Sequence, residues 1–153
     1  MKTALLALAF VVASTAAHAQ SEPWNGLENK GARYAGTKDA RDNAVIFVCP
    51  VTGVPQLIVR SHQFRVSVPD DHRYTLTFAT GRGRSEVTAV SKDAELIFDA
   101  ADVNAQVVFE RLAEDIAASQ AFSISMSPFG WKGQFTAEGA AEALKPMIAG
   151  CRE

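Results

Sequence analysis

The sequence predicts an α+β fold: an antiparallel β-sheet or small β-sandwich with one mid-chain helix, one short C-terminal helix and one disulfide. Three observations lead to this fold class. Short runs that alternate apolar and polar residues, separated by hairpin-length turns, occupy residues 44–98. The period then changes to that of an amphipathic helix over about 103–118. The chain has two cysteines, Cys49 and Cys151, and it begins with a segment typical of exported proteins.

The first 19 residues have the composition of a secretory signal peptide. Lys2 provides a basic start, an apolar run follows over about 4–13, and Ala17-His18-Ala19 resembles a cleavage site. The apolar run is too short to span a bilayer, and the alternative for this segment is a buried N-terminal helix. The mature chain starts without the cysteine that a lipid anchor needs. We therefore expect signal peptide 1–19 to be removed and the rest to reach a bacterial periplasm.

The composition restricts the class of function. The formal net charge is −2 for the whole chain, and losing Lys2 with the leader makes it about −3. About 134 residues remain, which suits a single β-rich domain over 20–153 with one core. The mild acidity argues against nucleic acid or an anionic membrane surface as a partner, because both attract clustered lysine and arginine. No later segment is apolar enough to span a membrane, and the basic run GRGR (81–84) is typical of a solvated hairpin turn.

In an oxidising compartment the two cysteines predict one intramolecular disulfide. Cys49 ends the apolar run AVIFVC, which has the pattern of a strand, and Cys151 ends a run with helical spacing. The alternatives are a redox pair, which is normally close in sequence, and two free thiols, which are unusual after export. A bridge would close a loop of roughly 100 residues and stabilise the fold by about 4–5 kcal/mol. It would tie the end of a short C-terminal helix to an early strand.

The strands are predicted from residue alternation and from turn signals between them. Residues 20–43 are polar and interrupted by glycines, so we expect an irregular lead-in with a short strand near Arg33 and Tyr34. Trp24 and Tyr34 are expected to pin this segment to the rest of the domain. The run AVIFVC is apolar on both faces, which is typical of a central strand. The expected strands are 44–49, 56–60, 64–68, 73–78, 85–91 and 95–98, followed after the helix by 121–127 and 132–136.

Two helices are predicted after residue 100. Apolar residues recur at helical spacing in the segment 103–118, whose start Asp102 or Asn104 can cap. The C-terminal helix is expected over about 138–150. Pro146 lies inside that range and removes a backbone donor, so we expect a kink or break near Lys145.

The candidate catalytic chemistry centres on the turn PDDHR. His72 follows Asp70 and Asp71, which allows an acid–base pair or part of a metal site, but the same composition is typical of a solvated loop. A metal site would need further ligands at suitable spacing, and no G-x-S-x-G or phosphate-binding loop is present. We therefore predict no catalytic residue, no metal and no cofactor, and we expect His62 to lie at the surface.

The turn SPFGW is the second candidate site. Phe129 and Trp131 lie beside a proline and a glycine, so an aromatic ring is expected near a loop tip, where such rings often anchor protein contacts. The alternative is that Trp131 folds back onto the sheet.

The layout resembles small exported bacterial proteins of the invasion-associated locus B type and of the periplasmic type VI secretion accessory type. The resemblance covers most of the mature chain: a strand ending in cysteine, antiparallel strands, one helix, then GQFTAEGAAEALKPMIAGC. Its sharpest matches are Cys49, Phe135, Gly139, Ala143, Leu144 and Cys151. The resemblance implies a β-rich periplasmic domain and supplies no catalytic residue.

Three functional hypotheses follow. The first is a non-enzymatic periplasmic protein that binds or assists another envelope protein. The second is a secreted inhibitor of a hydrolase, a protease or lysozyme, that acts through PDDHR or SPFGW. The third is a small hydrolase that uses His72 with Asp70 or Asp71. A flat apolar patch would favour the first, a rigid protruding loop the second, and a deep pocket around His72 the third.

Overall fold

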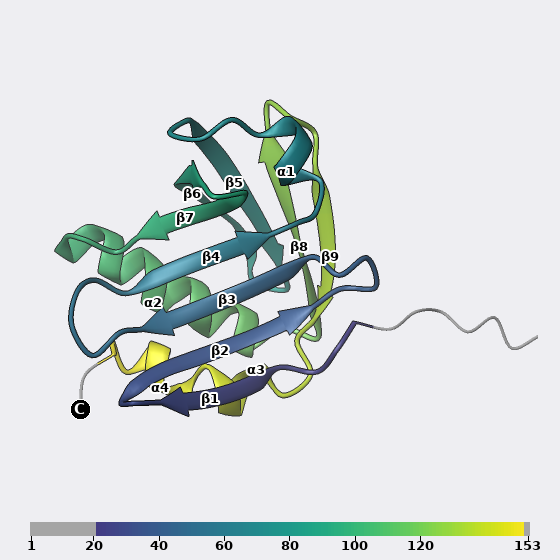
Figure 1. Cartoon of the computed structure of the whole chain (residues 1–153). Coiled ribbons are helices and arrows are strands. Elements are labelled where there is room, and N and C mark those ends of the chain that lie inside the picture. The colour runs from purple at the N-terminus through teal and green to yellow at the C-terminus, as the bar shows by residue number, and fades with distance from the viewer. Residues whose placement is uncertain (1–20, 152–153) are drawn as a thin grey trace, which may run out of the picture.

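The computed structural model describes residues 21–151, which form one nine-stranded antiparallel sheet with helices on one face (Figure 1). The strand order is β1-β2-β3-β4-β7-β6-β5-β8-β9. The strands are β1 (Asn25–Asn29), β2 (Ala32–Lys38), β3 (Ala44–Cys49), β4 (Gln56–Arg60), β5 (Arg73–Thr80), β6 (Gly83–Lys92), β7 (Glu95–Asp99), β8 (Ala121–Ser127) and β9 (Lys132–Thr136). The α+β class is confirmed, and of the two predicted arrangements, a sheet or a small sandwich, the chain forms the single antiparallel sheet.

The helices are α1 (Phe64–Ser67), α2 (Val103–Ala117), α3 (Ala140–Ala143) and α4 (Lys145–Ile148). Figure 1 shows the sheet curving around α2, with α3 and α4 behind β1 and β2. The predicted mid-chain helix is confirmed, and its Asp102 cap accepts a hydrogen bond from the backbone N–H of Ala105 at 2.9 Å. We call the face that carries α2, α3 and α4 the inner face and the opposite one the outer face.

The lead-in to β1 joins the two ends of the curved sheet. The N–H of Glu22 donates to the carbonyl of Lys38 in β2 at 2.8 Å. The indole Nε1 of Trp24 donates to the carbonyl of Thr136 in β9 at 2.9 Å, and its backbone N–H donates to Glu138. The expectation that Trp24 pins the lead-in is therefore confirmed, and the bonds hold β2 near β9.

The core lies between the inner face and α2. Phe47 of β3 sits between Trp24 and Phe109 of α2, with ring centroids 6.1 Å and 5.1 Å away. Phe122 and Phe135 of the neighbouring strands β8 and β9 stack at 5.2 Å. These rings are buried, so the helix and both ends of the sheet share one aromatic cluster.

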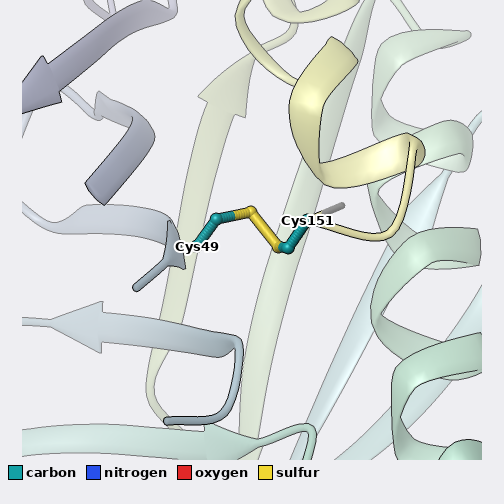
Figure 2. The surroundings of a disulfide bond; sticks show 2 residues. All are labelled: Cys49 and Cys151. Carbon is teal, nitrogen blue, oxygen red and sulfur yellow. A yellow bond between two sulfur atoms is a disulfide. The ribbon is translucent and has the colours of Figure 1, made fainter. Parts of the chain in front are cut away.

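The predicted disulfide between Cys49 and Cys151 is present (Figure 2). The two Cα atoms are 5.3 Å apart and the residues are 102 positions apart in sequence. Cys49 ends β3, and Cys151 follows α4, which packs on both β3 and α2. The bond therefore attaches the C-terminal helices to the end of β3, which is an interior strand of the sheet.

The prediction of a strand over 64–68 is wrong, because this segment forms the helical turn α1. Phe64 and Val68 are both buried, and the N–H of Val68 donates to the carbonyl of Phe64 at 3.1 Å. Apolar residues four apart fit one helical turn as well as they fit a strand, and a run of five cannot distinguish the two periods. The lead-in is also more regular than the sequence predicts, because it contains the hairpin β1–β2 in place of one short strand.

The C-terminal helix is divided as predicted. α3 and α4 meet at Leu144, and Pro146 lies in the first turn of α4. Backbone N–H groups in the first turn have no acceptor within the helix, so the N–H that proline lacks costs no helical hydrogen bond. Gly139 precedes α3 with φ 78°, and a Cβ there would lie 3.1 Å from the carbonyl oxygen of Trp24. A side chain at this position would therefore strain both the backbone and the lead-in.

The β2–β3 hairpin depends on Asp39. Its Oδ1 accepts hydrogen bonds from the N–H groups of Arg41 and Asn43 at 2.8 Å and 3.0 Å, and its Oδ2 accepts from the Asn43 amide at 2.7 Å. Asp39→Ala should lower the free energy of unfolding by about 2–3 kcal/mol, because it leaves buried donors of Asn43 unsatisfied. Urea denaturation measures this. The control Asp42→Asn in the same turn should have little effect, and equal losses would contradict the assignment.

Candidate functional site

The outer face carries a row of β-branched apolar side chains across neighbouring strands. The register pairs Ile46 of β3 with Ile58 of β4, Ile58 with Ile97 of β7, and Ile97 with Val90 of β6. The isoleucines are half-buried and Val90 is 39% exposed. We call Ile46, Ile58, Ile97 and Val90 the apolar row. Helices α2, α3 and α4 lie on the other side of these strands (Figure 1).

The other half of the same outer face is lined with hydroxyl groups. Thr88 lies two residues before Val90 on β6 and pairs with Thr75 of β5, which pairs with Ser127 of β8. Residues two positions along these strands share the face. Thr77, Ser123 and Ser125 are among them, together with Glu86, which pairs with Thr77. The outer face therefore changes from apolar to hydroxyl-bearing between β7 and β5.

A polar rim borders the apolar row on one side. Arg60 of β4 forms an ion pair with its cross-strand partner Glu95, and Lys38 of β2 donates to Asp42 at 2.9 Å. This hydrogen bond, reinforced by the opposite charges, lowers the pKa of Asp42 and raises the pKa of Lys38. A cavity of about 430 Å³ lies along this rim and reaches Ile46. Charged groups thus flank the apolar row.

The two loops predicted as candidate sites lie at one end of the sheet. Thr75, just after PDDHR, pairs with Ser127, just before the turn that contains Phe129. Asp70, Asp71 and His72 are exposed, as is His62. The tertiary structure therefore gathers segments more than 50 residues apart in sequence into one region.

The contacts of His72 are those of a structured turn. Its Nδ1 lies 2.9 Å from the backbone carbonyl oxygen of Asp70, and its N–H donates to Oγ of Ser91 at 3.0 Å. The Ser91 hydroxyl in turn donates to the carbonyl of Pro69 at 2.5 Å. Within residues 21–151, no group of three or more histidine, cysteine, aspartate and glutamate side chains is arranged to hold a metal ion.

The two aromatics of SPFGW have opposite environments. Trp131 is 4% exposed, and its ring meets the ring of Phe64 edge-on at 5.1 Å. Phe129 is 41% exposed, and Val66 of the adjacent α1 is 90% exposed. Trp131 therefore supports α1 from inside, and of the two aromatics Phe129 is the one that a partner can reach.

The apolar row was not identified from the sequence, although a signal was present. AVIFVC has apolar residues on both faces, which was interpreted as a sign of a central strand. β3 is indeed an interior strand between β2 and β4, but its outward Ile46 is in register with the outward Ile58 of β4, which is in turn in register with Ile97 of β7. Isoleucines at the outward positions of three consecutive sheet neighbours would have indicated an apolar outer surface.

Comparison of the chain with protein-family models, with curated proteins and with solved structures finds no match. The resemblance to exported proteins of the invasion-associated locus B and type VI accessory types thus stays an expectation. Among the described residues, the structure contains no helix with the length and apolar character needed to cross a membrane.

Proposed function

We propose that the chain is exported by signal peptide 1–19 and that the mature domain binds another protein of the cell envelope, without catalysing a reaction. The Cys49–Cys151 disulfide supports export, because such bonds persist in oxidising compartments such as the periplasm. The proposal takes the apolar row as the contact surface and the charged rim beside it as the border of that surface.

The observation that carries the proposal is the contrast within the outer face. One sheet presents isoleucine and valine across β3, β4, β7 and β6 but threonine and serine across β5 and β8. At about 4.8 Å between strands, the apolar row extends for roughly 15 Å over adjoining strands. An apolar band bordered by charged side chains is the arrangement found at protein contacts, where a partner removes the apolar groups from water.

The test replaces two members of the apolar row. Ile58→Thr with Ile97→Thr keeps the β-branch that suits a strand and adds a hydroxyl, as in the other half of the face. The oxidised wild-type protein is used to capture and identify a partner from periplasm, and the affinity is then measured with purified components. We expect the double variant to weaken binding by about tenfold or more.

The matched control is Thr75→Ser with Thr88→Ser, which alters the same face outside the apolar row and should bind as the wild type does. Circular dichroism confirms that each variant is folded. An identified partner that binds the isoleucine variant and the wild type equally would contradict the proposal.

A second candidate function is inhibition of a hydrolase by the turns that precede β5 and follow β8. The exposed Phe129 and Val66, supported from below by the Phe64–Trp131 contact, favour it. A rigid apolar tip of this kind suits insertion into a partner's cleft. In the same binding assay, loss of the partner in Phe129→Ala with Val66→Ala, and not in the isoleucine variant, would select this function.

A further inference from the structure

β1 is the terminal strand of the sheet, and its outer edge faces away from β2. All five residues, Asn25–Asn29, are exposed. Every second residue of such a strand directs its N–H and C=O away from its neighbour. Proteins commonly block an edge with proline, lysine or a bulge, and the sequence NGLEN contains neither residue and pairs with β2 in continuous register. The edge is therefore suited to pairing with another strand.

A cavity of about 450 Å³ lies beside this edge, between the β1–β2 hairpin and the helices α3 and α4. Figure 1 shows α3 and α4 directly behind the hairpin. Leu27, which is 63% exposed, and Tyr34 line the cavity from the strands, and Ala143 and Pro146 line it from the helices. Gly26 of β1 packs close to α3, and a Cβ there would lie in ordinary van der Waals contact with Cα of Ala143, at 3.6 Å. An edge strand with a helix alongside forms a groove for an extended chain.

The charges of the groove favour a basic ligand. Among residues 21–151, the charged side chains that line the cavity are Glu28 of β1, Glu142 of α3 and Arg33 of β2, which are two carboxylates and one cation. Glu28 lies on β1 and Glu142 on α3, so a carboxylate stands on each wall of the cavity. A lysine or arginine entering the groove would meet a carboxylate of opposite charge on either wall.

We propose that β1 accepts an extended peptide segment of a partner protein, which adds to the sheet as a further strand. Side chains at alternate positions of that segment enter the groove between β1 and α3. The chemistry of the walls selects a medium-sized apolar side chain, with a lysine or arginine two residues away on the same face of the peptide. The proposal rests on the edge of β1 and on the cavity beside it, and not on the apolar row.

The test uses a fluorescent eight-residue peptide with the repeat threonine-valine-threonine-lysine, measured by fluorescence anisotropy against the oxidised protein. Two further peptides carry N-methyl groups, one on the threonines and the other on the valines and lysines. Strand addition uses the N–H groups of only one set, so we expect one methylated peptide to lose binding and the other to retain it.

Variants then locate the groove. Ala143→Leu should fill the cavity and lower affinity by about tenfold or more, and Glu142→Gln should lower both affinity and its dependence on salt. Glu86→Gln, on the outer face of β6, is the matched control and should bind normally. Ile58→Thr with Ile97→Thr should also bind normally, which separates this proposal from the proposed function. Because Glu142 is exposed, its variant remains informative if Ala143→Leu fails to fold.

Three results would overturn the proposal. The first is equal binding of both methylated peptides, which would indicate association without strand pairing. The second is normal binding by a folded Ala143→Leu together with normal binding by Glu142→Gln. The third is a dimer in sedimentation equilibrium that Ala143→Leu abolishes, because the edge would then be occupied by a second copy of this chain.

Discussion

Reduction of the Cys49–Cys151 bond is expected to lower the free energy of unfolding by about 2–5 kcal/mol. The bond joins residues 102 positions apart, so its loss returns a large amount of conformational freedom to the unfolded chain. A loss of this size is a large fraction of the net stability of a typical domain. Urea denaturation of the oxidised protein, with and without reductant, measures it.

The control is Cys49→Ala with Cys151→Ala, whose stability should be low and should not respond to reductant. In the reduced wild type, amide exchange should increase most in α4, because the bond attaches the residue just after this helix to β3. Coincident denaturation curves for the oxidised and reduced wild type would show that the cross-link adds nothing to stability.

Trp131→Ala is expected to lower the free energy of unfolding by about 3–5 kcal/mol. The ring is buried, and it contacts Phe64, the residue that attaches α1 to the core. Removing it leaves a cavity beneath α1 and separates the helix from the β8–β9 turn. Thermal and urea unfolding measure the loss, and near-ultraviolet circular dichroism should show the loss of the signal from the Trp131–Phe64 pair.

Phe129→Ala is the natural comparison, since Phe129 lies two residues away in the same turn and is exposed. Its stability should stay within about 0.5 kcal/mol of the wild type. Similar losses for Trp131→Ala and Phe129→Ala would mean that the turn is held by both rings. A stable Phe129→Ala protein is also the reagent that tests the loop end as a binding site, because it removes a surface contact without disturbing the core.

The apolar row and the edge of β1 would bind partners by different physics. The apolar row offers side chains on a sheet face, where shape and removal of apolar area from water decide affinity. The β1 edge offers main-chain donors and acceptors, where pairing is largely independent of sequence and the neighbouring groove selects side chains.

Much of the fold was predictable from local patterns. The strands 44–49, 56–60 and 132–136 have the predicted bounds, because alternation and turn residues act within a few positions of one another. The break near Pro146 follows from the covalent structure of proline. The disulfide followed from the cysteine count together with the predicted compartment.

The sequence by itself determined the elements with a long or regular pattern: seven of the strands that residues 21–151 form, the helix α2 and the Cys49–Cys151 link. The tertiary structure decided the helical state of 64–67, the burial of Trp131 and the alignment of Ile46 with Ile58 and Ile97. The physical reason is the distance along the sequence between the residues that determine each property. Local periodicity depends on neighbouring residues, whereas register, curvature and burial depend on which distant segments come together.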